Sequence, residues 1–315
     1  GRAGSERFRR VINTTAFTVS QGKTLSDSMA RFSDVFSEVE TGIVRAGEAA
    51  GNLDKMLNRL AEQEVRSHEL QVKLVSAMVY PTVVLIVLFL AASGMLVWVI
   101  PTLVRLLTEG GLKQVDFPVT TRLLIYFSNL MMHYWWAVFM GIVLVILLIR
   151  FYLTTENGRY HWDFLKLKIP VVGALLRKVF VLRFVSIFGI LIESGLPVVN
   201  ALTIVASALQ NQIYRLKMFE VIAKVSQGEK ISKNLAETPF LFPETVVNML
   251  AVGEQSASIG FIAGKVARQY DMEIDYALKR LMSLLEPLLV IFVGFSVALL
   301  ALAILTPIFR LTQLV

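Results

Sequence analysis

Few residues of this sequence combine in patterns that support catalysis. Its three histidines, His68, His133 and His161, lie in different regions and lack the spacing of zinc ligands. Cysteine is absent, which excludes disulfides and thiolate chemistry. The run from Gly260 to Lys265 is similar to a phosphate-binding loop, but it is one residue short between its glycines, and valine follows the lysine. We therefore expect no catalytic, cofactor-binding or metal-binding residue, and we expect that the protein is not an enzyme.

The acidic residues around Asp54 are the one group that could bind a hard cation. Calcium takes carboxylate oxygens as ligands, so a calcium ion is the alternative interpretation of this cluster. The cluster lacks the spacing of a calcium-binding loop, which favours a solvated acidic face without a metal.

Two glycine–glutamate pairs, Gly47-Glu48 and Gly253-Glu254, are the clearest candidates for a specific role. The first pair begins a run that continues to Gly51 and Leu53. Glycine adopts backbone shapes that other residues resist, and glutamate is favourable at the N-terminus of the next helix. The pairs therefore predict turns between helices. The alternative is that they form a contact surface for a partner protein.

Long apolar stretches follow both glycine–glutamate pairs in the sequence. Hydrophobic residues make up 55% of the chain and charged residues 17%, against roughly 25% charged in an average soluble domain. Each uncharged stretch exceeds the roughly 20 residues that cross a bilayer. We therefore predict an all-α, polytopic membrane protein with three transmembrane helices. The uncharged stretches lie between Lys73 and Arg105, between Arg122 and Arg150, and between Glu286 and Arg310.

The polar regions between these stretches have the apolar spacing of helices. We predict two helical-bundle modules that alternate with the spans, and the start of the second span stays open within 123–153. The predicted order is a first module at 1–78, a span at 79–104, a loop at 105–130, a span at 131–153, a second module at 154–286, a span at 287–309 and a tail at 310–315.

Lysine and arginine predict the orientation of these segments. Residues 1–78 carry eleven of these residues and residues 150–286 carry sixteen, whereas residues 105–134 carry three and residues 310–315 carry one. Basic residues concentrate on the cytoplasmic side of a membrane, so both modules are predicted to be cytoplasmic and the loop and tail periplasmic. The formal charge of +7 is thereby explained without a nucleic-acid partner.

An internal repeat relates the two modules. Val19-Ser20-Gln21-Gly22 recurs 206 residues later, and 20 of the 83 positions from 19 to 101 are identical at that offset without a gap. Two copies in one orientation require a returning span between them, which the second apolar stretch supplies. Helical sequence from about Ile169 precedes the second copy, so the first module is expected to lack its first helices.

The repeat also pairs the starts of two spans, Tyr80-Pro81 and Glu286-Pro287. Glu286 lies at the predicted cytoplasmic end of the third span, where a carboxylate can be solvated at the level of the lipid headgroups. The alternative is an ion pair with a basic group of a partner protein.

Several of these motifs, in their order and spacing, resemble the type II secretion F-protein family, the inner-membrane platform proteins of type II secretion and type IV pilus machines. The second copy of the first motif departs from the pattern at Ala257 and Ile259, which fits a divergent member such as one from a type IVb or conjugative pilus system. The matching segments are Gly47–Leu53, Tyr80-Pro81, Ile169–Gly173, Ser194–Pro197, Gly253-Glu254, Glu286-Pro287 and Pro307-Ile308.

The resemblance implies a place and partners for the chain. It implies a multi-pass protein of the bacterial inner membrane, without cofactors, that forms a homodimer or a higher homo-oligomer within the lipid bilayer. The implied partners are a hexameric assembly ATPase, pilins or pseudopilins that are extracted into a fibre, and other inner-membrane assembly components. The alternative is a membrane transport or receptor component that oligomerises to form a substrate path, but the three uncharged stretches contain none of the charged residues typical of such paths.

Overall fold

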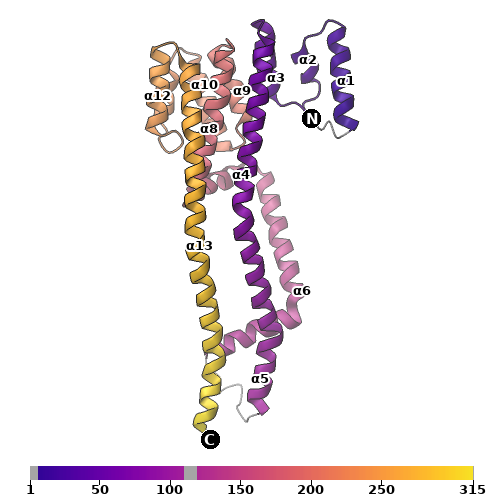
Figure 1. The fold of residues 1–315 in the computed structure, drawn as a ribbon, viewed down its shortest axis with the longest axis vertical. Coiled ribbons are helices and arrows are strands. Elements are labelled where there is room, and N and C mark those ends of the chain that lie inside the picture. Colours follow the sequence, from indigo (N-terminus) through magenta and orange to yellow (C-terminus); the bar gives the residue numbers. More distant parts are fainter. Residues whose placement is uncertain (1–5, 110–118, 315) are drawn as a thin grey trace. The chain divides into compact units, whose positions relative to one another are not determined.

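The computed structural model describes residues 6–109 and 119–314, and within these ranges it contains helices and no strands. The chain divides into two compact units. Unit 1 comprises Gly1–Gln71 and Glu156–Leu278, and unit 2 comprises Val72–Thr155 and Lys279–Val315. Figure 1 labels most of the helices. The prediction of an all-α fold is confirmed.

The first module of unit 1 contains three helices and the beginning of a fourth. These are α1 (Glu6–Ser20), α2 (Leu25–Ala30), α3 (Glu38–Ala49) and the start of α4 (Leu53–Gly94). Ser37 and Glu40 form a capping box at the start of α3, in which each side chain accepts a hydrogen bond from the backbone amide of the other residue. Gly22 ends the α1 turn at a φ of +87°, a conformation that glycine adopts at little cost.

The second module repeats this arrangement and adds helices before it. Shifting α2 and α3 by 206 residues gives the bounds of α11 and α12, and the same shift places the start of α4 on the start of α13. The structure thus confirms the internal repeat. The helices are α7 (Glu156–Lys168), α8 (Val172–Glu193), α9 (Val198–Ala208), α10 (Gln212–Val225), α11 (Ile231–Ala236), α12 (Glu244–Gln255) and the start of α13 (Ile259–Leu314).

Helix α8 supplies much of the core of unit 1. It is apolar on most of its circumference, as expected for a helix covered by neighbours on several sides. Phe184 and Phe188 stack within it, and Phe242 meets the Phe184 ring edge-on. Helices α8 and α9 also pack against α3 of the first module. The core is therefore continuous between the two modules, with Ile43 and Val44 in the same buried cluster as the α8 phenylalanines.

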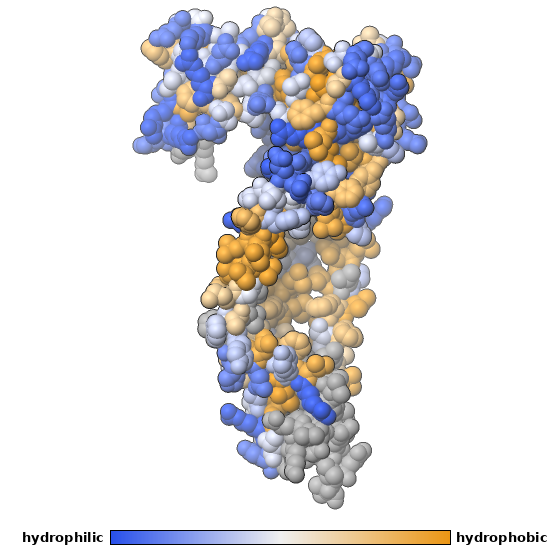
Figure 2. Space-filling model, turned by 180° about the vertical axis from the view of Figure 1, so that it is seen from behind, coloured by the Kyte–Doolittle hydropathy of each residue, from blue (hydrophilic) through white to orange (hydrophobic). Residues whose placement is uncertain are grey.

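Unit 2 contains the apolar helices. Two helices, within Leu53–Thr102 and Ile259–Ala298, are long and apolar enough to cross a membrane. A third candidate is the bent pair Ile125–Tyr134 and Phe139–Thr154, whose parts meet at 78°. On the face shown in Figure 2, hydrophobic residues dominate unit 2 and hydrophilic residues dominate unit 1. The chain is therefore an all-α membrane protein.

The π-helix Met95–Val99 interrupts the first span and is followed by α5 (Ile100–Glu109). Pro101 cannot donate a backbone hydrogen bond, and its ring crowds the carbonyl four residues earlier, so the helix widens before it. The Ser128 hydroxyl donates to the Leu96 carbonyl at 2.6 Å. A side chain of unit 2 thus satisfies a backbone group near the widened turn.

The segment 105–130, predicted as a loop, is helical at both of its described ends. Helix α5 extends to Glu109, and α6 (Val119–Thr154) begins well before the predicted second span. The predicted turns at Gly110-Gly111 and Phe117-Pro118 lie outside the described residues. Tyr134 has non-helical φ and ψ of −121° and 19°, so α6 is kinked there. The sequence shows no proline or glycine at this position that would have predicted a kink.

Candidate functional site

The Glu48 carboxylate closes the first glycine–glutamate turn. It accepts hydrogen bonds from the Leu25 amide at 2.5 Å, the Ser26 amide at 3.1 Å and the Ser26 hydroxyl at 2.6 Å. The first amides of a helix lack partners within it. Thr24 satisfies the Asp27 amide at 3.2 Å, so Glu48 and Thr24 together cap the start of α2.

Glu254 repeats this contact in the second module. Its carboxylate accepts hydrogen bonds from the Ile231 amide at 2.6 Å and the Ser232 amide at 3.2 Å. The Ser232 hydroxyl also donates to it. The prediction that these glutamates serve the next helix is wrong, because each lies in the last turn of its own helix and caps the short helix that precedes it.

Gly47 and Gly253 lie inside helices and are required by close packing. A Cβ added at Gly47 would lie 2.8 Å from the Met56 Cβ, and one at Gly253 would lie 2.9 Å from the Ile259 Cα. The prediction of an unusual backbone shape is therefore wrong for these two residues. Their lack of a side chain allows α3 and α12 to approach the helix that follows.

The unusual backbone shape occurs four residues later. Gly51 has a φ of +67°, and Ala257, at the equivalent position, has a φ of +51°. The left-handed conformation costs a residue with a Cβ roughly 1–2 kcal/mol. The second module has thus kept the turn while losing the residue that adopts it most easily. Leu53 begins α4 directly after the first turn and packs, half-buried, against the core.

The proline-containing candidates belong to unit 2. Tyr80 is exposed, whereas Pro81 is buried inside α4. Glu286 and Pro287 are both exposed within α13. The glycine–glutamate turns, by contrast, belong to unit 1. Among the described residues, no group of three or more histidine, aspartate or glutamate side chains is placed to hold a metal ion.

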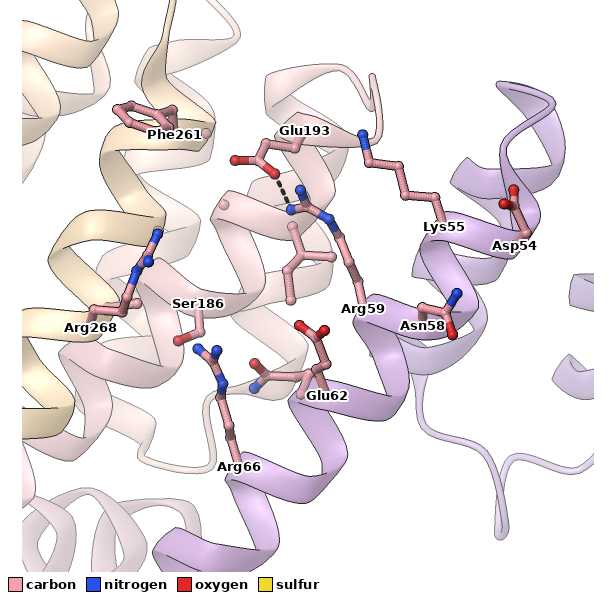
Figure 3. Close-up of a pocket in the computed structure, with 16 residues that line it drawn as sticks. Asp54, Lys55, Asn58, Arg59, Glu62, Arg66, Ser186, Glu193, Phe261 and Arg268 are labelled. Atoms are coloured by element: carbon pink, nitrogen blue, oxygen red, sulfur yellow. Dashed lines mark hydrogen bonds and ion pairs between the residues drawn. The ribbon is translucent and has the colours of Figure 1, made fainter.

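A polar groove in unit 1 was not predicted. It has a volume of about 730 Å³ and lies between the first turns of α4, α8 and the start of α13. Gly189 and Gly260, which line it, allow α8 and the start of α13 to approach each other closely. Figure 3 shows Arg66 on α4 and Arg268 on α13 reaching into it from different helices. In the described part of the chain, neither guanidinium forms an ion pair with an acidic residue.

An ion pair connects two of the helices beside this groove. The Arg59 guanidinium on α4 pairs with the Glu193 carboxylate on α8, drawn as a dashed line in Figure 3. Burial raises the pKa of the Glu64 carboxyl, and Glu40 adds to this shift while Arg183 opposes it. Burial also lowers the pKa of the Arg183 guanidinium. Charged side chains of both modules thus face one another along α4 and α8.

Comparison with known proteins identifies the family of this chain. The sequence profile of the type II secretion system (T2SS), protein F, matches residues 1–101 and 184–307, which contain both glycine–glutamate turns. The chain belongs to this family. The type IV pilus assembly protein PilC of Myxococcus xanthus is 33% identical over 304 residues, which cover 96% of this chain and 72% of that protein. The type II secretion system protein F of Aeromonas hydrophila is 32% identical over 314 residues, covering 98% and 78%.

Membership in the T2SS protein F family explains why the two matching segments share one local structure. Each contains a short helix capped by glutamate and a glycine that admits a neighbouring helix. In this member, Ala257 and Ile259 depart from the motif without changing the course of the backbone. Sequence reasoning missed the pair of Arg59 and Glu193, because 134 residues separate the two side chains.

Proposed function

We propose that the chain is an inner-membrane platform protein of a type IV pilus or type II secretion machine. The relatives named for pilus assembly and for secretion support this proposal, because each aligns with nearly the whole chain. In the proposed role, a cytoplasmic assembly ATPase acts on the two modules, and the spans bring pilins or pseudopilins from the bilayer into a growing fibre. The chain itself catalyses no reaction and functions as a homo-oligomer.

The continuous helices are the observation that carries this proposal. Helix α4 runs unbroken from Leu53 to Gly94, and α13 runs from Ile259 to Leu314. At 1.5 Å per residue, the 56 residues of α13 extend about 80 Å. Each module therefore leads into an apolar span through one helix without a loop. A displacement of either module would pass directly to a span, as a platform that couples a motor to a membrane process requires.

We place both modules on the cytoplasmic side, with the spans at 79–104, 131–153 and 287–309 between polar regions. The excess of lysine and arginine in the modules supports this orientation. The repeat requires both modules to lie on the same side of the membrane. Three spans meet this requirement, because the second span returns the chain to that side. Protease added to inside-out membrane vesicles should cut the modules, whereas protease added to spheroplasts should leave them intact.

The groove offers a contact surface for the proposed cytoplasmic partner. Arg66 and Arg268 would pair with carboxylates of an acidic segment. Changing both arginines to glutamate should reduce co-purification of the co-expressed assembly ATPase. The matched control changes Arg45 and Lys233, two exposed cations of unit 1 outside the groove, to glutamate.

Complementation provides the functional test. Cells that lack this gene should regain fibre assembly or secretion with the wild-type gene and with the control double variant, but not with the variant of Arg66 and Arg268. Full fibre assembly and secretion in cells without the gene would overturn the proposed function. Normal activity of the groove variant would overturn only the role given to the groove.

A further inference from the structure

Helix α7 exposes an apolar stripe. Trp162, Leu165 and Ile169 follow the spacing i, i+3 and i+7, which places them on one face, and their exposed fractions are 40%, 52% and 42%. The Ile169 amide donates to the Leu165 carbonyl at 3.1 Å, so Ile169 continues the helical turn. On the opposite face, Leu167 is buried in the core of unit 1. The side of α7 turned away from the core is therefore apolar.

Basic side chains border this stripe on both edges. At 100° per residue, Arg159 and Lys166 lie along one edge and Lys168 lies along the other. The Lys166 ammonium lies 5.6 Å from the centre of the Trp162 ring, and it also pairs with Asp163 at 3.2 Å. An apolar stripe that includes tryptophan between basic edges is typical of helices that lie in the headgroup region of a membrane.

The turn after α7 extends the apolar surface through a strained backbone. Val171 has a φ of +67° and a ψ of −59°, and the Val172 amide donates to the Pro170 carbonyl at 2.7 Å. These values define a γ-turn with positive φ, a rare and strained conformation. Val171 and Val172 nevertheless remain 51% and 43% exposed. Contacts within the protein therefore bury neither valine, and strain of this kind is characteristic of functional positions.

Gly173 holds the turn in this position. A Cβ added to Gly173 would lie 2.2 Å from the Leu167 carbonyl oxygen, so only glycine admits this close approach. The Gly173 amide donates to the Ile169 carbonyl at 2.8 Å. The exposed valine thus belongs to a closed, hydrogen-bonded turn that keeps its side chain on the surface.

The short connection between α6 and α7 determines the surroundings of the apolar stripe. Only Thr155 separates the end of α6 from the start of α7. The uncharged stretch of α6 ends at Arg150, and the bent pair within α6 is a candidate membrane span. A helix tethered by one residue to the end of a span begins at the membrane surface. A bilayer is therefore the nearest apolar phase to the stripe.

We propose that α7 and its following turn form a membrane-surface anchor that binds anionic lipids. Trp162, Leu165, Ile169 and Val171 lie at the boundary between headgroups and acyl chains. Arg159, Lys166 and Lys168 pair with anionic headgroups at the edges of the stripe. The anchor depends on the α6 span and not on the proposed motor partner. Its failure would therefore leave the platform function untouched.

The absence of native cysteine permits a direct test with single nitroxide labels. Leu165→Cys and Val171→Cys report on the anchor. Val252→Cys is an equally exposed control on α12, and Val87→Cys is an exposed control in the apolar part of α4. Each full-length variant is reconstituted into liposomes that contain phosphatidylglycerol and phosphatidylcholine. Collisions with oxygen and with a water-soluble nickel complex are then measured by power saturation.

The ratio of oxygen collisions to nickel collisions should be several-fold higher for the labels at 165 and 171 than for the label at 252. It should approach the ratio of the label at 87. The anchor would be overturned if the labels at 165 and 171 collided with nickel as often as the label at 252. Protection from both reagents would also overturn it, because a protein surface would then cover the stripe.

A second comparison tests the headgroup contact. Changing Arg159 and Lys168 to glutamate should lower the oxygen preference at 165 in phosphatidylglycerol liposomes several-fold more than in pure phosphatidylcholine. The control changes Arg45 and Lys233, which lie outside α7, to glutamate and should have no such effect. An unchanged preference in the charge-reversed variant would overturn the binding of anionic lipids. Far-UV circular dichroism verifies that both double variants remain folded.

Discussion

The Glu48 carboxylate accepts a 2.6 Å hydrogen bond from the Ser26 hydroxyl, which ties the end of α3 to the start of α2. The same carboxylate accepts from the Leu25 and Ser26 amides. This residue is half-buried, so water can replace these bonds only in part. Glu254 makes the equivalent contacts in the second module, so each glutamate connects two helices of its own module.

Replacing Glu48 by alanine should lower the free energy of unfolding by about 2 kcal/mol, because the first α2 amides lose a charged acceptor. Glu254→Ala should have a similar effect through α11. Scanning fluorimetry of the detergent-solubilised protein measures the change in melting temperature. Glu69→Ala, an exposed glutamate on α4, is the control and should change stability by no more than about 0.5 kcal/mol. A melting temperature equal to that of the wild type would contradict the capping role.

Reciprocal substitutions at the two left-handed positions should act in opposite directions. Ala257→Gly relieves a positive φ and should stabilise the protein by about 1 kcal/mol, whereas Gly51→Ala should destabilise it by about 1 kcal/mol. A Cβ at Gly51 would meet nothing within 4 Å, so only the backbone contributes. Thermal unfolding of both variants checks the signs, and destabilisation by Ala257→Gly would refute this interpretation.

Gly47→Ala tests the close approach of α3 to α4. The new Cβ would lie 2.8 Å from the Met56 Cβ, and overpacking of this kind lowers stability by about 1–3 kcal/mol. Gly264→Ala is the matched control, because a Cβ there meets nothing within 4 Å and alanine favours a helix by roughly 0.5–1 kcal/mol. The prediction fails if both variants shift the melting temperature in the same direction.

The charge cluster around Glu237 predicts a pH dependence. Hydrogen bonds from Lys224 and Lys217 lower the pKa of the Glu237 carboxyl from 4.5 to about 2. A carboxyl with a lowered pKa in the folded state stabilises the protein above the pKa of the unfolded state. This stabilisation is lost as the pH falls from about 4.5 towards about 2.

Glu237→Gln should therefore reduce the fall in melting temperature over this acidic range. The effect should be small, because Glu237 is exposed and solvent screens its ion pairs. Glu244→Gln is the control, since that carboxylate lies in the first turn of α12, outside the cluster. Parallel pH profiles for wild type and Glu237→Gln would show that the cluster does not contribute to acid sensitivity.

The sequence predicted the fold to the extent that its signals were local or repeated. Gly22 recurs at Gly228, and both residues have a positive φ at the end of a helix. The repeat register predicted equivalent helices in the two modules, and uncharged length predicted the apolar helices. The kink at Tyr134 has no local signal, because neither proline nor glycine occupies this position.

The candidate site was harder to predict because its contacts are distant in sequence. The motif identified Glu48, yet its partners lie 22 and 23 residues earlier, across a helix and a turn. A sequence pattern gives the residue but not the direction in which the carboxylate points. The groove depends on Arg66, Gly189 and Arg268 from three helices, and only the folded chain brings them together.

The short separation between Glu48 and its partners has a consequence for biosynthesis. Synthesis proceeds at about 5–20 residues per second, so the first turn can close within a few seconds of α2 leaving the ribosome. By contrast, Gly42 packs against Ile204, which is made much later. The first module can therefore acquire its local structure before the second span is synthesised. Its final packing must wait until the ribosome has completed α9, so the nascent chain passes through a stage in which the first module is locally folded but lacks its contacts with α9.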